Sequence, residues 1–292
     1  MSDDSVLVEG LKSVSLTDRV TSKLTDSQVA ILGQLQKLQK TRDDLEVEFN
    51  KELNELRSKY DTLYQPLYES RFKALTQPSG DEYGTPSLPK FWLTAMKNNK
   101  TLRRIIELHD EPVLAYLSDI SAEFLEPKKQ ESFKIVMTFD KNPYFTNTTL
   151  VKQYNMKSLD GEVESLLQGT VATEINWLPD KDVTKQTVTK IQRHKKTKET
   201  RTRVDLEDKP SFFRFFTGQE VPTTEELNKM SKLEISELEM YVEEDYDIGI
   251  VLRDKLVPEA IYWYLGVVDD EDADDDEPDS YENSEDLSSD SD

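Results

Sequence analysis

Residues 45–67 of this 292-residue chain read LEVEFNKELNELRSKYDTLYQPL, and this stretch decides the fold class. Apolar residues recur in it at steps of three and four while charged and polar residues fill the gaps, which is typical of an amphipathic α-helix. The pattern extends back to Thr25, which with Gln28 predicts a capping box at the start of the helix. A helix over residues 26–77 would be roughly 78 Å long. Pro66 predicts a kink or a break in it.

A helix of this length cannot fold back onto a small domain along its whole length, so its apolar stripe needs a partner. Two partners are possible for the stripe. One is a second helix within the same chain, and the other is the equivalent helix of a second copy of the protein. Because no second helical segment of matching length follows, we favour a homodimer joined by a coiled coil. The residues expected in the dimer seam are Leu38, Leu45, Phe49, Leu53, Leu56, Tyr60, Leu63 and Leu67.

The remaining sequence predicts an α+β fold with four parts. We expect a flexible N-terminal arm over residues 1–24, the dimerisation helix over 25–77, an α+β domain over 78–266 and a disordered acidic tail over 267–292.

The α+β domain should contain a four-stranded antiparallel sheet and flanking helices. Helical spacing runs over residues 87–124, and a period of two begins at Ser132, with strands predicted near 133–139, 150–154 and 171–177. Short connections without crossover helices favour antiparallel pairing.

A protruding β-hairpin is predicted over about residues 183–193 and 200–206, because neither stretch has a strong apolar face. Helical spacing returns over 223–255 and ends before Pro258.

The charge balance points to a cationic partner. The chain has 59 acidic and 37 basic residues, for a net charge of −22, and residues 269–292 hold 14 of the acids and no Lys or Arg. Such a surface repels nucleic acid and anionic membranes, so we expect no direct nucleic-acid binding. No apolar run approaches the ~20 residues that span a bilayer, and the acidic start lacks the apolar stretch of a signal peptide. We therefore expect no membrane association and a location in cytosol or nucleus.

Motifs that carry catalysis are missing from the sequence, and we expect no enzyme, no cofactor and no metal site. The chain has no cysteine, and its nine glycines form none of the glycine-rich phosphate-binding motifs. His109 and His194 each lack a second histidine at ligand spacing. Four phenylalanines within residues 211–216 are assigned to the core.

Two acidic sets are the candidate binding site, one on the last helix and one in the tail. A fully extended tail of 24 residues spans roughly 80 Å, so its charges lie about 6 Å apart, against one per ~1.7 Å on duplex DNA. Such a protein could hold a cationic partner and yet lose it to DNA, as a histone carrier must. The alternative for the acids on the last helix is an ordinary solvent-exposed helix face without a binding role. The predicted histone-binding residues are Glu234, Glu237, Glu239, Glu243, Glu244, Asp245, Asp247, Asp269, Asp270, Glu271, Asp272, Asp274, Asp275, Asp276 and Glu277.

Short signals for transport and modification are also present. A basic run in the hairpin could be a nuclear import signal or a partner contact, or an ordinary strand tip, and the sequence leaves this open. Ile31, Leu35 and Leu38 have the spacing of an export signal, and Ser280, Ser284 and Ser289 lie among acids that an acidophilic kinase could recognise. Import and export receptors and such a kinase are therefore candidate partners. The basic run consists of Arg193, Lys195, Lys196, Lys198, Arg201 and Arg203.

Five motifs, taken in order, resemble the nucleosome assembly protein family of histone chaperones. They are residues 89–98 (PKFWLTAMKN), 109–120 (HDEPVLAYLSDI), 142–147 (NPYFTN), 211–216 (SFFRFF) and 245–258 (DYDIGIVLRDKLVP). The resemblance covers roughly residues 26–266.

The resemblance implies a long dimerisation helix that leads into an α+β domain. It implies binding of core histones, chiefly the wedge-type histone dimer, transfer to DNA without ATP, and shuttling between cytoplasm and nucleus. The acids from Glu237 to Asp247 match the histone-facing helix of the family. Asp110 and Glu111 match a motif for which we expect a capping role. The alternative is a SET-like dimeric adaptor or phosphatase inhibitor.

Overall fold

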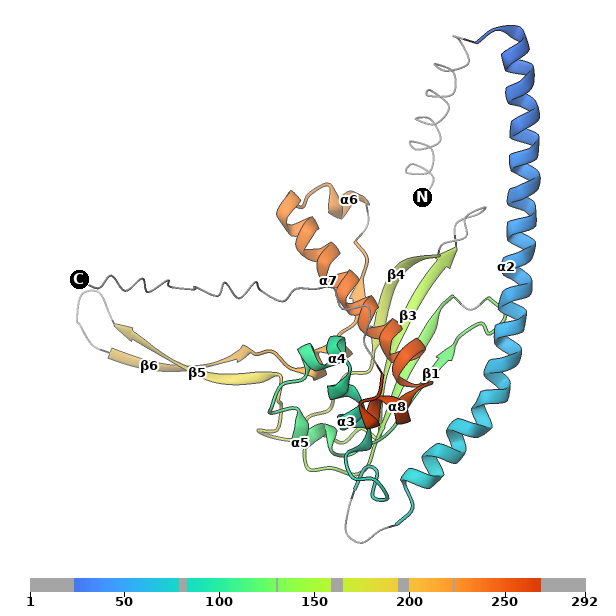
Figure 1. Ribbon diagram of the computed structural model, residues 1–292. Coiled ribbons are helices and arrows are strands. Elements are labelled where there is room, and N and C mark those ends of the chain that lie inside the picture. The colour runs from blue at the N-terminus through green and yellow to red at the C-terminus, as the bar shows by residue number, and fades with distance from the viewer. Residues whose placement is uncertain are drawn as a thin grey trace, which may run out of the picture.

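The computed structural model describes residues 24–78, 83–129, 131–158, 165–193, 200–222 and 224–268. A long helix, α2 (Asp26–Leu75), runs beside an α+β domain from which a β-hairpin projects (Figure 1). The predicted arm at 1–24 and the predicted tail at 267–292 lie almost wholly outside the described residues. None of the described helices combines the length and the apolar character that crossing a membrane requires.

Helix α2 confirms the predicted long helix and its start. The Thr25 N–H donates to Gln28 Oε1 at 2.8 Å, as a capping box requires. Of the two outcomes expected at Pro66, a kink or a break, the break is absent, because the helix continues through Pro66 to Leu75. The C-terminal turns of α2 bend away from the axis of the preceding turns (Figure 1). Since proline lacks an N–H and crowds the preceding turn, bending is the ordinary consequence of its place inside a helix.

The apolar stripe of α2 faces away from the domain. Asn50, Leu53, Asn54 and Ser58 are half-buried on the domain side, and Asn54 Nδ2 donates to the Lys129 carbonyl at 2.9 Å. Of the eight residues predicted in the dimer seam, Leu53 alone is half-buried. The other seven are 45–68% exposed. A packed intramolecular helix pair is therefore ruled out for the described residues. The exposed stripe residues are Leu38, Leu45, Phe49, Leu56, Tyr60, Leu63 and Leu67.

The central sheet is antiparallel and has five strands where four were expected. The strand order is β1-β2-β3-β4-β7. The bounds are β1 Leu117–Phe124, β2 Phe133–Phe139, β3 Thr149–Ser158, β4 Ser165–Ala172 and β7 Gln219–Glu220.

Strand β1 corrects the helix predicted up to residue 124. Leu114, Leu117 and Ile120 have helical spacing, yet residues 119–124 pair in register with β2. Pairing with a neighbouring strand decided between the two patterns, because propensity is a weak prior that tertiary contacts override. The strand predicted near 171–177 is also shifted. It ends at Ala172, and Trp177 forms only an isolated bridge with Phe145.

The projecting hairpin is confirmed. It consists of β5 (Lys185–Arg193) and β6 (Thr200–Asp208), which pair with each other and with no strand of the central sheet.

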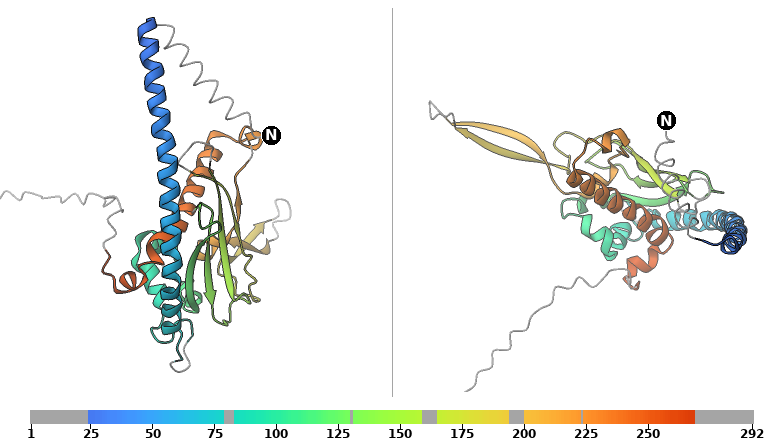
Figure 2. Two further views of the ribbon diagram at one scale, coloured as in Figure 1. Left: turned by 90° about the vertical axis from the view of Figure 1, so that its right-hand side faces the viewer. Right: turned by 90° about the horizontal axis from the view of Figure 1, so that it is seen from above.

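Helices gather on one face of the central sheet (Figure 2). The helix predicted over 223–255 is divided into three pieces, because a turn separates the first two and the last continues as a π-helix. Buried residues such as Trp92, Ile135, Leu252 and Trp263, each at most 2% exposed, join the helices to the sheet. The helical elements are α3 (Phe91–Asn98), α4 (Lys100–Ile105), α5 (Glu111–Leu114), the 3-10 helix η1 (Phe212–Phe216), α6 (Thr224–Leu227), α7 (Lys232–Ile250), the π-helix η2 (Val251–Leu256) and α8 (Ala260–Leu265).

Arg71 attaches the end of α2 to the domain. Its guanidinium carbon lies 4.8 Å from the ring centroid of Tyr68 and 4.9 Å from that of Trp92, and Nη1 donates to the Val257 carbonyl. Asp119 on β1 is the opposing charge. Burial raises the Asp119 pKa to about 6, although the attraction of Arg71 lowers it in part. Arg71 Nε and Asp119 Oδ1 are both buried without a hydrogen-bond partner in the described structure.

We expect the substitution Asp119→Asn to remove a pH-dependent loss of stability. The folded-state pKa is raised, so the stabilising contribution of Asp119 is complete below pH ~3.8 and is lost as the pH rises through about 6. Between pH 4.5 and 7.5 the native chain should lose on the order of 2 kcal/mol more unfolding free energy than the Asn variant. Urea unfolding at the two pH values measures this difference. Equal losses in both chains would contradict it.

Candidate interaction surface

Helix α7 carries the predicted acidic set and has a well-formed start. The Glu234 N–H donates to Ser231 Oγ at 3.2 Å, and the Ser231 N–H donates to Glu234 Oε2 at 2.7 Å. Hydrogen bonds from Ser231, first of all from its backbone N–H, lower the pKa of the Glu234 carboxylate. The side chain of Glu234 therefore closes the first turn of α7 while it remains exposed.

Six of the seven acids predicted on this helix are exposed. They follow α7 from its first turn to its last turn and differ in direction around the axis, since each residue turns the helix by about 100°. We call these six residues the α7 acids. They are Glu234, Glu237, Glu239, Glu243, Glu244 and Asp247.

Asp245, the seventh acid, does not belong to the exposed set. It is 7% exposed and forms a buried ion pair with Lys152 of β3, so it is not available as a surface contact in this structure. The reason is its place on the side of α7 that rests on the sheet. Its neighbours Ile248 and Gly249 are buried on that side as well.

Lys152 is the centre of a buried polar network that fixes α7. The Lys152 side chain is fully buried, and Nζ donates to Asp245, to the Phe215 carbonyl at 2.7 Å and to the Thr217 carbonyl at 3.2 Å. Burial lowers the pKa of Lys152 and raises that of Asp245, and their mutual attraction opposes both shifts. The network ties β3, η1 and α7 together.

Tyr154, two residues further along β3, supplies a second anchor. Its hydroxyl donates to the Asp245 carbonyl at 2.8 Å, and burial raises the pKa of the phenol. A Cβ atom at Gly249 would lie 2.6 Å from Tyr154 Cζ. Glycine is therefore required where α7 crosses this ring.

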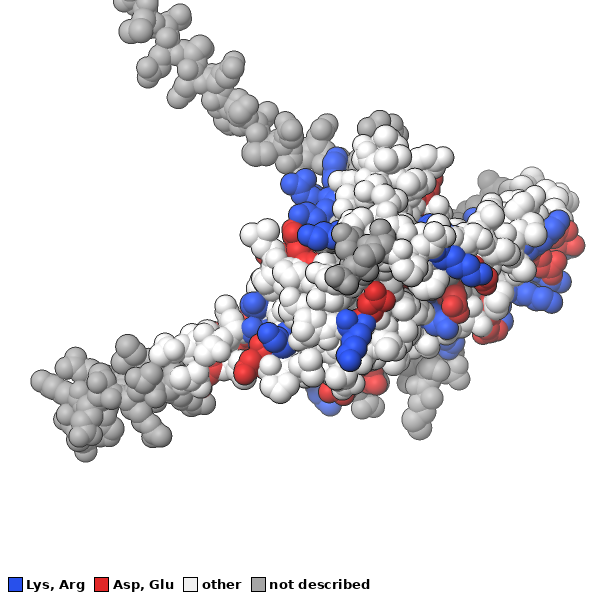
Figure 3. All heavy atoms as spheres, turned by 90° about the horizontal axis from the view of Figure 1, so that it is seen from below, with Lys and Arg blue, Asp and Glu red and all other residues white. Residues whose placement is uncertain are grey.

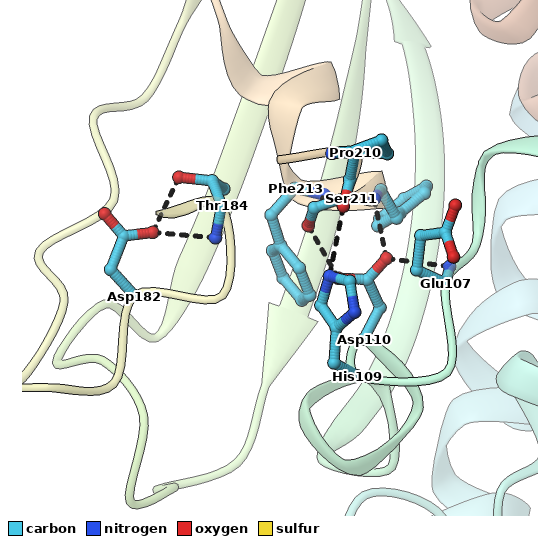
Figure 4. Close-up of polar contacts among 9 residues, drawn as sticks. Glu107, His109, Asp110, Asp182, Thr184, Pro210, Ser211 and Phe213 are labelled. Carbon is cyan, nitrogen blue, oxygen red and sulfur yellow. Dashed lines mark hydrogen bonds and ion pairs between the residues drawn. The ribbon is translucent and has the colours of Figure 1, made fainter. Parts of the chain in front are cut away.

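Asp110 holds the start of η1 in place (Figure 4). Its fully buried carboxylate accepts hydrogen bonds from Ser211 Oγ at 2.6 Å, the Phe212 N–H at 2.7 Å and the Glu107 N–H at 2.9 Å. His109 Nε2 lies 3.0 Å from the Pro210 carbonyl. The capping role expected for Asp110 is wrong for α5, because its side chain makes no cap hydrogen bond to that helix and instead holds Ser211 and Phe212 at the start of η1.

Contacts around this network test two further expectations from the sequence. Glu111, for which a capping role was expected, forms an ion pair with Lys97 of α3. The four phenylalanines of η1 are buried, as their assignment to the core predicted.

The network around Lys152 was missed at the sequence level, although a signal was present. Leu150, Lys152 and Tyr154 share one face of the predicted strand, so the lysine had to point into the core between two large side chains. A buried ammonium requires a carboxylate partner. The sequence alone does not single out Asp245 from its acidic neighbours.

Several predicted site residues lie at or beyond the limits of the described structure. Arg193, Arg201 and Arg203 fall at the outer ends of β5 and β6. Lys195, Lys196 and Lys198 lie outside the described residues, as do the tail acids from Asp269 to Glu277. Within the described ranges, no group of three or more acidic or histidine side chains is placed to hold a metal ion.

Comparison with known proteins places the chain in one family. A family model described as Nucleosome assembly protein (NAP) matches residues 31–267. Nucleosome assembly protein 1;1 of Arabidopsis thaliana is 37% identical over 267 residues, which cover 85% of this chain and 68% of that protein. Nucleosome assembly protein 1;2 of Oryza sativa subsp. indica is 35% identical over 302 residues, with 92% and 80% covered.

Solved structures agree with the sequence matches. Nucleosome Assembly Protein 1 from Plasmodium knowlesi superposes with a TM-score of 0.65 at 35% identity, over 84% of this chain and 99% of that one. The two proteins thus share an overall fold over most of their length. The chain belongs to the nucleosome assembly protein family.

Proposed function

We propose that this protein is a histone chaperone that takes part in nucleosome assembly. It binds core histones, chiefly the wedge-type histone dimer, through the α7 acids and the acidic residues of the tail. The observation that carries the proposal is the set of six exposed carboxylates on one anchored helix. Membership of a family whose members are named nucleosome assembly proteins supports it.

The anchoring of α7 favours tight binding of a basic partner. The helix is held by Lys152, Tyr154 and η1 before any partner arrives, so less conformational entropy is lost on binding. Transfer to DNA requires no ATP in this scheme. Duplex DNA has a higher charge density than the protein and takes the histone by competition.

The proposal includes a homodimer that shuttles between cytoplasm and nucleus. The dimer would form through the stripe on α2, whose residues are uncovered in the single chain. Import would use the basic run at 193–203, export would use Ile31, Leu35 and Leu38, and an acidophilic kinase would act on the tail serines.

Reversing two of the α7 acids should weaken histone binding without unfolding the chain. We expect Glu237→Lys with Glu244→Lys to lower the affinity for purified core histones about tenfold or more, because attraction is replaced by repulsion at two exposed positions. Fluorescence titration at 50, 150 and 300 mM salt measures the affinity. The loss should shrink as salt screens the charges.

The matched control changes the same charges elsewhere. Glu55 and Glu69 are exposed on α2, and Glu55→Lys with Glu69→Lys alters the net charge equally. This control should bind histones nearly as well as the native chain. Equal losses in both variants would refute the α7 acids as the contact, and no binding by the native chain at 150 mM salt would refute the function itself.

A further inference from the structure

Helix α4 exposes a group of cations on a protein whose net charge is −22. Leu102 is fully buried, whereas Lys100, Arg103 and Arg104 are exposed. We call these three residues the α4 basic patch. Neither arginine of the patch forms an ion pair within the part of the chain that the structure describes. In Figure 3 one cluster of Lys and Arg side chains lies at the upper left of the face seen from below, and other Lys and Arg side chains are scattered over the rest of that face.

The chain leaves the domain beside this patch. Asn98, the last residue of α3, donates from Nδ2 to the Trp263 carbonyl at 2.7 Å and to the Tyr264 carbonyl at 3.3 Å. Gly266 ends α8 in the left-handed conformation, and a Cβ atom there would lie 3.6 Å from Asn98 Nδ2. Because Lys100 follows Asn98 by two residues, Gly266 lies close to the first turn of α4, and the acidic segment follows it three residues later in the sequence.

Charge and reach both favour contact between the segment and the patch. Residues 269–292 contain 14 acids and no Lys or Arg. Helix α4 has 6 residues and is therefore about 9 Å long. Three to five extended residues cover that length at about 3.3 Å each. A short tether also gives a local concentration in the millimolar range, so individually weak ion pairs can hold the segment.

We propose that the acidic C-terminal segment, residues 269–292, docks on the α4 basic patch of its own chain when no cationic partner is bound. The patch neutralises part of the segment, and a more cationic partner must displace it. The proposal goes beyond histone binding and can be tested without histones. The basic run at 193–203 is the rival docking site, since roughly 80 Å of extended segment reaches far across the molecule.

Zero-length cross-linking of the full chain tests the proposal. A carbodiimide joins a carboxylate to an amine that it contacts, and peptide mass spectrometry then finds links between Lys100 and the acidic segment. At 10 mM salt such links should form, and at 1 M salt they should disappear, as the Debye length falls from about 30 Å to about 3 Å. Mixing isotope-labelled with unlabelled chains separates links within a chain from links between chains.

Charge reversal on α4 should remove the links. Arg103→Glu with Arg104→Glu should lower the yield at Lys100 roughly five- to tenfold, because two exposed ion pairs are replaced by repulsion. Lys229→Glu with Lys232→Glu is the matched control, since both lysines are exposed at the far end of the helical layer. Arg103→Lys with Arg104→Lys keeps the charge, so the introduced amines should themselves become linked to the segment.

The outcomes decide between the possibilities. Loss of the links in the α4 reversal alone, together with links to the introduced amines, supports the proposal. Links that persist in the α4 reversal, that fall equally in the control, that join only different chains, or that involve only the lysines of the hairpin would each overturn it. If the α4 reversal fails to fold by circular dichroism, the charge-conserving variant still decides, because absence of links to its amines overturns the proposal.

Discussion

Two aspartates placed in the apolar stripe of α2 should convert the proposed dimer into monomers. Leu56 is 51% exposed and Leu63 is 56% exposed in the single chain, so neither contributes much to the core of its own domain. In a coiled coil each would lie in the seam and be desolvated. Leu56→Asp with Leu63→Asp should weaken dimerisation at least about 1,000-fold, because a buried unpaired carboxylate costs several kcal/mol. Sedimentation equilibrium at micromolar concentration measures this change.

A control of equal charge isolates the stripe. Thr62 and Gln65 are exposed on other sides of α2, within two residues of Leu63. Thr62→Asp with Gln65→Asp should leave the dimer intact, and circular dichroism should show that both double variants keep their helix content. A dimer that survives in the stripe variant would mean that the two copies meet on another surface.

Removal of the buried ammonium at position 152 should destabilise the domain strongly. Lys152→Met keeps the size of the side chain but leaves the Asp245 carboxylate buried without its partner, and the carbonyls of Phe215 and Thr217 lose their donor. We expect a loss of about 3–5 kcal/mol in unfolding free energy, the usual cost of breaking a buried ion pair from one side. Differential scanning calorimetry should show a melting temperature lower by roughly 10 °C.

Two further variants distinguish the ion pair from the simple loss of a lysine. Lys157 is exposed on the same strand, and Lys157→Met should change the unfolding free energy by less than about 0.5 kcal/mol. Lys152→Met with Asp245→Leu removes both charges and should recover part of the lost stability. If the double variant is as unstable as Lys152→Met alone, most of the lost unfolding free energy comes from the packing of the lysine side chain and not from the unpaired Asp245 carboxylate.

Periodicity predicted the elements in which one pattern dominates over many residues. Helix α2 has an apolar stripe over most of its length, and β2 alternates buried with half-buried residues from Phe133 to Phe139. The hairpin and the exposure of most acids on α7 were also foreseen. In each case the local pattern and the tertiary environment favour the same structure, so the sequence alone was sufficient.

The secondary structure of short segments could not be predicted from their own sequence, because it depends on the elements that they pair with. Residues 117–124 fit either a helix or a strand, and only pairing with β2 made them β1. The strand β7 has 2 residues, too few for any period, and exists because β4 offers an edge beside it. The helix predicted as one piece over 223–255 is divided where the local hydrogen-bonding pattern changes.

By itself, the sequence determined that this protein has a long helix with an unshared apolar stripe, an α+β domain and a large excess of negative charge. Only the tertiary structure decided which acids face solvent. Asp245 and Glu244 are adjacent in the chain, yet one is buried against Lys152 and the other is exposed. The physical reason is that charge and periodicity are properties of the chain, whereas desolvation depends on which distant residue completes the contact.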